Sequence, residues 1–441
     1  MAHGNRERTS SEVRRVAQQI DLLIHNIGTL VTMKGKSGPR QGREMSEAAS
    51  LQQGAVAIRG GIIAAIGTEA DVRAEIGGAA IAAAYDAEGL LVTPGLVDPH
   101  THLVHGGSRE NELSLKLQGA SYLDILAQGG GILSTVRATR RASEEELFHK
   151  AKRSLDTMLQ FGVTTAEAKS GYGLTLEDEI KQLRVTQKLN EAHPVQLVST
   201  FMGAHMVPEE YKGRADEYVQ LVIQVMLPEV KRQGLAEFCD VFCEQGVFTV
   251  DQSQRVLEAA KALGFAVKIH ADEIEPMGGA ELAGELGCIS AEHLLAASDT
   301  GLEAMQRAGV IAVCLPATSF NLRLKHHAHA RRMIELGLAV AVSTDYNPGS
   351  SPTENIQLAM TLACLNLGMT PEEVLTAVTI NAAHAIGRGD RVGSLEIGKQ
   401  ADIVIFNAPN LAYLPYHFGI NHVHTVIKQG KIVVSQGRLL Q

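Results

Sequence analysis

Short apolar runs alternate with longer amphipathic stretches through the middle of this 441-residue chain. The apolar runs "VQLVSTFMGAH", "AVKIHADE" and "AVAVSTD" are typical of buried strands. "EEELFHKAKRSLDTMLQFG" and "VDQSQRVLEAAKALG" place apolar residues at helical spacing and end at glycine. Strands that alternate with helices predict parallel β/α units, and about eight such units predict a closed barrel. An open doubly wound sheet is the alternative, which is disfavoured because no glycine-rich dinucleotide motif opens the first unit.

The two ends of the chain resemble each other and differ from this middle part. "DLLIHNIGTLVTM" and "AVAIRGGIIAAIG" near the start, and "HVHTVIKQGKIVV" near the end, predict short strands joined by turns. Residues 1–20 are expected to form a polar tail, because no apolar segment of signal-peptide length follows their charged and serine residues.

Composition narrows the choice of partners. The formal net charge is −9, so there is no surplus of Lys and Arg to attract nucleic acid or an anionic membrane, and a small-molecule ligand is expected. No apolar run approaches the roughly 20 residues that span a bilayer. The five cysteines are odd in number and lack Cys-x-x-Cys spacing. They predict neither a disulfide framework nor a thiolate zinc site, and they favour a reducing cytoplasm.

An early apolar run, "LVTPGLVDPHTHL", ends with two histidines one residue apart. On an extended strand, residues i and i+2 face the same side, so the rings of His100 and His102 are expected to project together. Paired neutral imidazoles commonly bind transition metals. The motif alone is weak support, because short motifs often match by chance.

Polar residues also end later apolar runs, where a barrel of this kind carries its functional side chains. They are His205, His270, Glu273, His293 and Asp345. Each alone is more often a satisfied polar residue than a ligand, but several at one end of successive strands predict a catalytic metal site. The expected reaction is hydrolysis, because such an ion activates water and polarises a carbonyl. Glu273 or His293 is expected to transfer protons.

These motifs resemble the metal-dependent amidohydrolase superfamily, whose pattern is matched by "PGLVDPHTH", "HADE", "AEH", "STD" and "GSLEIGKQADIVIF". Within it, "DPHTHLVHGGSRENE", "TTAEAKSGYGL", "FMGAHMVPEEY" and "STDYNPGSSP" are similar to the imidazolonepropionase family. The similarity covers nearly the whole chain from about Asp21. The tail before it and the polar loop from Lys34 to Gly54 are longer than the family needs, and neither is given a function.

The resemblance implies an α/β fold, with a (β/α)8 barrel at residues 94–393 and a small β-sandwich domain built from residues 21–93 and 394–441. It implies one metal ion, zinc or iron, held by His100, His102, His270 and Asp345. The implied substrate is 4-imidazolone-5-propanoate, whose cyclic amide is hydrolysed to N-formimidoyl-L-glutamate in histidine degradation. A homodimer is expected from the resemblance and from the commonness of twofold assemblies.

The same resemblance assigns the remaining roles. Arg109 is expected to bind the carboxylate arm of the substrate, because a planar guanidinium can donate two hydrogen bonds to a carboxylate. The catalytic roles fall on Glu273, His293 and Asp345. The other implied pocket residues are Tyr122, Tyr172, His205, Glu273, Asn347, Gly349 and Ser350.

Three alternatives are open at this point. Lys169 would bridge a second metal ion in a two-metal site, although a lone lysine at a strand end is usually a salt-bridge partner. A ring-amidine deaminase would use the same metal and the carboxylate of "HADE", but its substrate would not need Arg109. A barrel that binds a ligand without catalysis would not need the full set of candidate ligands and acids.

Overall fold

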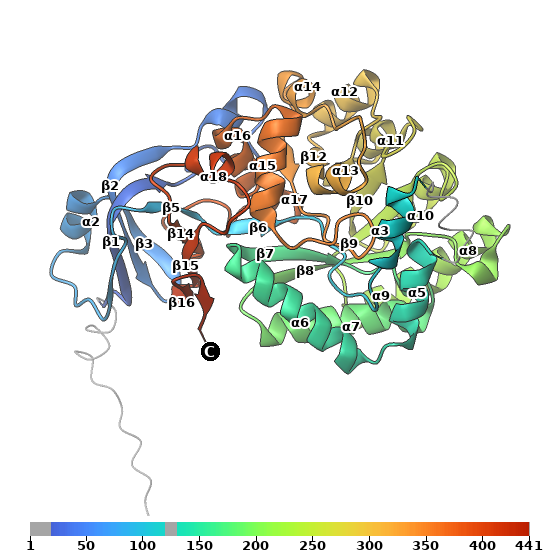
Figure 1. Ribbon diagram of the computed structural model, residues 1–441, viewed down its shortest axis with the longest axis horizontal. Helices are drawn as coiled ribbons and strands as arrows, with labels where there is room; N and C mark the ends of the chain where they lie inside the picture. Colours follow the sequence, from blue (N-terminus) through green and yellow to red (C-terminus); the bar gives the residue numbers. More distant parts are fainter. Residues whose placement is uncertain (1–18, 120–129, 441) are drawn as a thin grey trace, which may run out of the picture.

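The computed structural model describes residues 19–119 and 130–440. It contains an eight-stranded sheet and a nine-stranded sheet. Figure 1 shows helices surrounding the eight-stranded sheet on one side of the molecule, while the other sheet lies beside it and joins strands from both chain ends.

The eight-stranded sheet is the barrel, and its strands pair in parallel in the order of the chain. They are β6 (Leu96–Asp98), β7 (Val163–Lys169), β8 (Gln196–Ala204), β9 (Phe238–Cys243), β10 (Ala266–Ala271), β11 (Ser290–His293), β12 (Ile311–Cys314) and β13 (Val340–Val342). The first and last strands are joined beyond their ends, where Thr101 pairs with Tyr346 in a parallel bridge. The carboxylate of Asp98 also accepts hydrogen bonds from the hydroxyls of Ser343 and Thr344. The predicted (β/α)8 barrel is confirmed.

Helices follow the strands and cover the outside of the barrel (Figure 1). Several begin at the capping signals that the sequence contains: Ser143 and Thr249 each form a capping box with the residue three positions on. The helices of the barrel region are α3 (Asn111–Leu117), α5 (Ile132–Arg141), α6 (Glu144–Gln160), α7 (Leu176–Ala192), η2 (Glu209–Tyr211), α8 (Ala215–Leu221), η3 (Val222–Met226), α9 (Leu227–Gln233), α10 (Val250–Ala262), α11 (Gly279–Leu286), α12 (Asp299–Ala308), α13 (Pro316–Asn321), α14 (Ala330–Glu335), α15 (Ile356–Leu367), α16 (Pro371–Ala377) and α17 (Ile380–Ala385).

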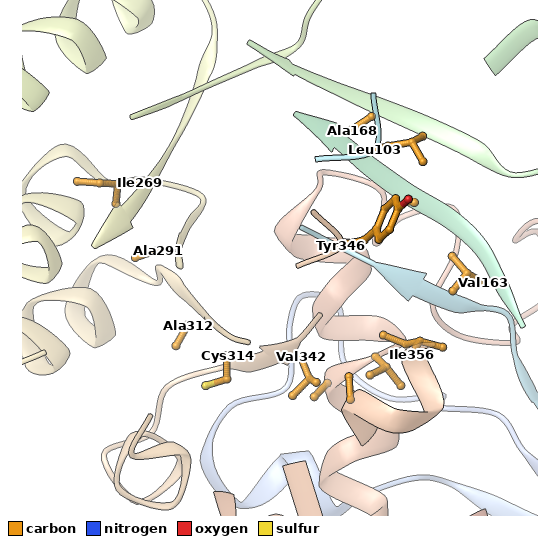
Figure 2. Packing of buried hydrophobic residues seen from close by; sticks show 14 of the residues in the cluster. Leu103, Val163, Ala168, Ile269, Ala291, Ala312, Cys314, Val342, Tyr346 and Ile356 are labelled. Atoms are coloured by element: carbon orange, nitrogen blue, oxygen red, sulfur yellow. The ribbon is translucent and has the colours of Figure 1, made fainter. Parts of the chain in front are cut away.

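Alternation along the strands sorts apolar from polar side chains. Ala168 and Ile269 belong to the main apolar cluster, which packs between the strands and the helices (Figure 2). Their chain neighbours Glu167, Lys169 and Lys268 are equally buried but charged. Because successive side chains of a strand point to opposite faces, these charges point into the barrel.

The small β domain draws its strands from both ends of the chain, as predicted. Its hydrogen-bonded path runs β17-β16-β15-β14-β5-β1-β2-β3, and β4 pairs with β1. Its elements are β1 (Leu22–Val31), β2 (Ser50–Arg59), β3 (Ile62–Thr68), α2 (Glu69–Ile76), β4 (Ala84–Asp86), β5 (Leu91–Pro94), β14 (Ile403–Phe406), α18 (Tyr413–Tyr416), β15 (Val423–Lys428), β16 (Lys431–Ser435) and β17 (Arg438–Leu439). The chain passes directly from β5 into barrel strand β6 through Gly95, where a Cβ would lie 2.3 Å from Thr164 Oγ1.

The polar loop predicted from Lys34 to Gly54 is shorter than expected, because β2 already begins at Ser50, and the part before β2 packs against the barrel. It contains the short helix η1 (Gly42–Ser46) and, before it, the buried Arg40. The Asn381 side chain accepts a hydrogen bond from Arg40 N and donates one to Arg40 O. Gly42 N donates to Leu338 O, just before β13 begins. The loop therefore covers the N-terminal end of the barrel beside β13, opposite the end where the strands finish.

Across the described ranges, no helix combines the length and the apolar character that crossing a membrane requires. All five cysteines lie within these ranges and are unbonded to one another.

Candidate metal centre and active site

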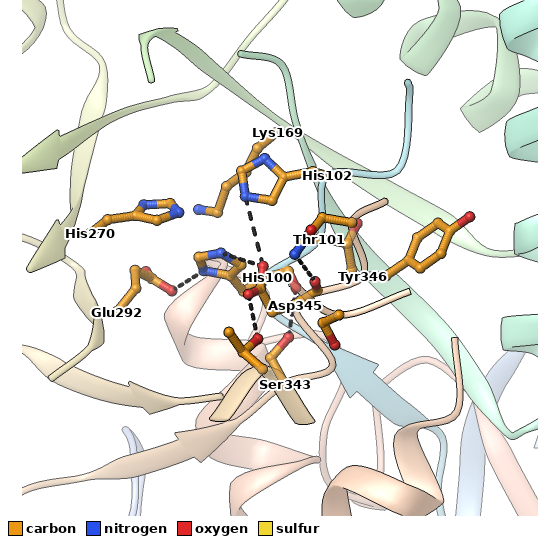
Figure 3. A network of polar contacts seen from close by, with 12 residues as sticks. His100, Thr101, His102, Lys169, His270, Glu292, Ser343, Asp345 and Tyr346 are labelled. Atoms are coloured by element: carbon orange, nitrogen blue, oxygen red, sulfur yellow. Dashed lines mark hydrogen bonds and ion pairs between the residues drawn. The ribbon is translucent and has the colours of Figure 1, made fainter. Parts of the chain in front are cut away.

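A cluster of histidines and one aspartate lies at the C-terminal end of the barrel, and Figure 3 shows its centre. The possible ligand atoms of His100, His102 and His270 lie within 4.8 Å of one another, as do those of His100, His293 and Asp345. The rings of His100 and His270 have their centroids 4.6 Å apart. The structure thus brings together all four residues for which a metal-binding role is predicted.

Two of the histidine rings are each held in place by a carboxylate at Nδ1. His100 Nδ1 lies 2.6 Å from Glu292 Oε2, and His270 Nδ1 lies 3.1 Å from Asp240 Oδ1. A carboxylate accepts a hydrogen bond, so Nδ1 carries the proton in both rings and Nε2 keeps its lone pair. Both Nε2 atoms are buried and have no hydrogen-bond partner within the described ranges. Buried polar atoms without partners are rare, so these two fit the role of metal ligands.

Burial also favours the metal-binding form of the histidines. It lowers the pKa of His100 and of His102 well below the ordinary value, and the Lys169 ammonium lowers both further. A neutral imidazole is the form that binds a metal ion. The donor set of neutral histidines and a carboxylate fits one divalent metal ion.

Asp345 faces the histidines through one oxygen. Its Oδ1 lies 3.4 Å from His100 Nε2 and 3.8 Å from His102 Nε2. Its Oδ2 accepts a hydrogen bond from the Thr318 hydroxyl at 2.5 Å. Burial raises the pKa of Asp345 to about 7, although the hydrogen bond from Thr318 acts in the opposite direction.

Glu273 and His293 form a pair at the edge of the cluster. Glu273 Oε1 lies 3.6 Å from His293 Nδ1. Burial, together with the nearby carboxylates of Asp345 and Glu244, raises the pKa of Glu273 to about 8. A carboxyl group with a pKa in this range can accept and donate protons near neutral pH.

The residues expected to contact substrate lie around this cluster. The His205 ring stacks on the His102 ring with a centroid distance of 4.8 Å, and Tyr172 lies 5.3 Å from His205. The Asn347 side chain accepts hydrogen bonds from the backbone N–H groups of Gly349 and Ser350 and donates one to the Ser350 hydroxyl. Tyr122 lies outside the described residues.

Arg109 lies in the loop after the paired histidines and is oriented by Glu112. Its Nε and Nη2 donate to the two carboxylate oxygens of Glu112 at 2.9 and 2.8 Å. Its Nη1 lies against Gly349, where a Cβ would be only 2.0 Å away. Any side chain at position 349 would therefore displace the guanidinium.

Comparison with known proteins identifies the family. A model of the amidohydrolase family matches residues 91–433. An imidazolonepropionase from Alkaliphilus metalliredigens is 60% identical over 422 residues, which cover 96% of this chain and 100% of the relative. An imidazolonepropionase from Geobacillus kaustophilus is 56% identical over 95% of this chain and 99% of its own length. The chain belongs to the imidazolonepropionases, within the amidohydrolase family.

Solved structures show the same fold at lower identity. An adenosine deaminase from Xanthomonas campestris, solved with bound zinc, has a TM-score of 0.69 and 20% identity, covering 96% of this chain and 95% of that chain. A triazine hydrolase variant has a TM-score of 0.71 and 17% identity, covering 95% and 96%. At these identities the likeness shows the fold alone, so the deaminase does not favour a deaminase activity over that of the imidazolonepropionases.

In this member of the imidazolonepropionases, Lys169 is bound by two carboxylates. Its Nζ lies 2.9 Å from Glu167 Oε2 and 2.7 Å from Asp240 Oδ2, and all three side chains are fully buried. The ammonium is thus engaged as an ion-pair partner. This arrangement favours a single ion over a site bridged by Lys169.

Three residues that hold the cluster in place have no role in the sequence-based prediction, namely Asp240, Glu292 and Thr318. Two of them carry a signal, because each is an acidic residue within an apolar strand, in "FCDVFC" and "CISAEH". A charge in such a run must point inward and find a partner, since an unpaired buried charge is too costly. Thr318 carries no comparable signal, because it reaches Asp345 from the first turns of α13.

Proposed function

We propose that this chain hydrolyses the ring amide of 4-imidazolone-5-propanoate to N-formimidoyl-L-glutamate. The observation that carries the proposal is the loop after β13. It supplies Asp345 to the histidine cluster and, four residues later, Gly349 to the guanidinium of Arg109. One loop therefore links the candidate metal centre to the Arg109 guanidinium, with which the carboxylate arm of the substrate would pair. A nucleobase has no carboxylate arm to occupy this position.

We propose that one ion, zinc or iron, is held by His100, His102, His270 and Asp345. When bound, such an ion polarises the amide carbonyl and makes water a stronger nucleophile at neutral pH. Histidine and carboxylate ligands suit several first-row metals. Elemental analysis of protein purified without added metal identifies the ion.

Glu273, His293 and Asp345 are proposed to manage the protons. Hydrolysis of the amide removes a proton from the attacking water and delivers one to the leaving ring nitrogen. Glu273 has a raised pKa and lies 3.6 Å from His293, so it can pass a proton between these positions. The carboxylate of Asp345 is held in place by a hydrogen bond from the Thr318 hydroxyl.

Tyr172, His205, Asn347, Gly349, Ser350 and Tyr122 are proposed to line the pocket around the imidazolone ring and the carboxylate arm. The stacked rings of His102 and His205 provide one flat wall. Asn347 fixes the loop that carries Gly349 and Ser350, so the position of this loop relative to Arg109 is set before substrate binds.

Arg109→Ala tests the substrate assignment. The wild type should prefer 4-imidazolone-5-propanoate strongly over its propionamide analogue, and the variant should lose most of that preference in kcat/KM. Losing one partner of a desolvated ion pair costs about 2–5 kcal/mol, much of it from the stranded charge. Metal content should not change, because the side chain lies several residues beyond the paired histidines.

Two matched variants sharpen the comparison. Arg109→Lys should recover part of the preference, because a point charge cannot reproduce the two-pronged hydrogen bonding of guanidinium. Gly349→Ala keeps Arg109 but displaces its Nη1, so it should also reduce the preference for the acid. An unchanged ratio of acid to amide in Arg109→Ala would mean that this residue does not bind the carboxylate.

A further inference from the structure

A continuous chain of buried charges runs beneath the candidate metal centre and connects two of its histidines. Every side chain in it is at most 3% exposed. Every contact in it joins a carboxylate either to an ammonium group or to an imidazole. In order, it comprises His100, Glu292, Lys268, Glu167, Lys169, Asp240 and His270.

The two ends of this chain are the histidine–carboxylate pairs described above, and its middle is Glu167. Glu167 Oε1 lies 2.9 Å from Lys268 Nζ, and Glu167 Oε2 lies 2.9 Å from Lys169 Nζ. Lys169 then reaches Asp240 at 2.7 Å, and Lys268 reaches Glu292 at 3.6 Å. Glu167 therefore touches neither histidine, yet it binds both lysines that neutralise the carboxylates behind them.

The strands explain how the sequence builds this arrangement. Glu167 and Lys169 are two residues apart on β7, and Lys268 and His270 are two residues apart on β10. Residues at this spacing share a face, so both pairs point into the barrel. Lys268 Nζ also lies 5.6 Å from the centre of the Phe238 ring, which belongs to a buried apolar cluster.

The presence of these fully buried charges requires a physical explanation. Removing an ion from water costs several kcal/mol, and apolar residues of similar size usually serve stability as well or better. Three carboxylates and two ammonium groups are present, so the network nearly balances its own charge. The one carboxylate in excess gives the network a net negative charge. The network contacts His100 and His270 at Nδ1, on the side away from the candidate metal centre.

We propose that Glu167, with Lys169 and Lys268, is a shared positioning unit for metal binding. It holds Glu292 and Asp240 in place, and these fix the rings of His100 and His270 with Nε2 toward the ion. Such outer partners orient a histidine ligand and increase its basicity. The inference rests on the proposed function in taking His100 and His270 as metal ligands. It goes further, because it makes the metal affinity depend on Glu167, which contacts neither the proposed metal ligands nor the substrate.

Glu167→Gln tests the proposal, because it keeps the shape of the side chain and removes its charge. Metal-free protein is titrated with Zn²⁺ against a chromophoric chelator, and the Co²⁺-loaded protein is examined by visible absorption. We expect the variant to bind Zn²⁺ about 10- to 100-fold more weakly than wild type, as is typical for loss of an outer partner. We also expect a changed Co²⁺ spectrum, because the histidine rings are no longer fixed.

Asp402→Asn is the matched control. It breaks another buried ion pair, in which Asp402 Oδ2 lies 2.6 Å from Lys428 Nζ within the small β domain. It should lower thermal stability while leaving the Zn²⁺ affinity and the Co²⁺ spectrum unchanged. A general effect of breaking a buried ion pair would instead alter both variants alike.

Thr200→Val is a milder second variant, in case Glu167→Gln does not fold. Thr200 donates its hydroxyl proton to Glu167 Oε1, and valine removes that bond while retaining every charge. It should weaken Zn²⁺ binding in the same direction by a smaller factor. Folded variants that bind Zn²⁺ as tightly as wild type would overturn the proposal, even if wild type hydrolyses 4-imidazolone-5-propanoate. Wild type that binds Zn²⁺ but does not hydrolyse this substrate would instead overturn the proposed function.

Discussion

Asp345 and His293 combine a site role with an unusual backbone. Their φ angles are 51° and 71°, in the left-handed region that glycine usually occupies. Such conformations cost of the order of 1–3 kcal/mol in a non-glycine residue and persist where the surroundings enforce them. At Asp345, the Thr318 hydroxyl and the two histidines supply contacts that fix the side chain. Two residues of the candidate active site therefore have a backbone conformation that their surroundings must enforce.

The metal-binding and proton-transfer roles can be separated by two substitutions. His270→Ala should abolish both metal content and turnover, because it removes a ligand. Glu273→Gln should keep the metal and lower kcat by about 10²–10⁴, the typical contribution of a proton-transfer group. Elemental analysis and turnover of the two purified variants check this. Loss of metal from Glu273→Gln as complete as from His270→Ala would make Glu273 a ligand.

For single residues, the sequence could predict which side chains of the candidate site lie together, but not which neighbouring residues hold them in place. His100, His270 and Asp345 follow separate parallel strands, and the ends of such strands gather at one rim of a barrel. Their neighbours depend on details that spacing does not contain. Glu292 reaches His100 only because the barrel closes and brings β11 opposite β6, and Thr318 reaches Asp345 because of how α13 packs.

The start of α7 controls the loop that carries Tyr172. The Glu179 carboxylate accepts hydrogen bonds from the backbone N–H groups of Gly171, Gly173 and Leu174 at 3.1, 2.8 and 2.8 Å. One side chain of the helix thereby satisfies three donors of the loop after β7. The position of the Tyr172 ring next to His205 follows from this arrangement.

Glu179→Gln should loosen this loop, because its amide group would face the Gly171 N–H with a donor in place of an acceptor. We expect a loss of about 1–3 kcal/mol in the free energy of unfolding, the usual cost of an unsatisfied buried group. KM for the imidazolone substrate should rise more than kcat falls. Ser143→Ala is the control, since it removes the cap of α6 and costs about 0.5–2 kcal/mol without touching the pocket. Equal KM values in both variants would contradict a role for the Glu179 contact.

Element boundaries differ most from expectation at the paired histidines. The segment "GLVDPHTHL" predicts one strand, but β6 ends at Asp98. Pro99 explains the early end, because proline lacks the N–H that would continue the ladder. The two rings nevertheless project together, with centroids 5.4 Å apart. The His-x-His spacing thus predicted that the two side chains project together. The length of the strand depended instead on the backbone N–H that Pro99 lacks.

The stability of the whole metal-free molecule should depend on pH through the acids of the cluster. Burial raises the pKa of Asp345 to about 7 and of Glu273 to about 8, so the folded protein retains protons that the unfolded chain releases near pH 4. Stability from these groups is fully present below about pH 4, declines as pH rises because the unfolded acids ionise first, and is lost once the folded acids have ionised at about pH 7 and 8. The buried histidines act oppositely, but their contribution is complete above about pH 6.5.

Urea unfolding of metal-free protein should therefore show stability that falls between pH 7 and 8 and levels off at higher pH. The slope is at most about 1.4 kcal/mol per pH unit for each retained proton. Glu273→Gln should flatten this fall, because its amide does not titrate. Stability that is constant or rises over this range in wild type, with the same profile in the variant, would contradict the raised pKa of Glu273.

The homodimer expected from the family resemblance stays a prediction at this scale. Light scattering of the purified protein over a range of concentrations measures the assembly directly.

The pairing of β5 with β14 has a consequence for synthesis of the protein. About 300 residues separate these strands, and ribosomes add roughly 5–20 residues per second. Strand β5 is therefore synthesised about 15–60 s before its partner β14. The barrel strands, in contrast, are synthesised in the order in which they pair. The small β domain thus begins to emerge before the barrel and is completed after it.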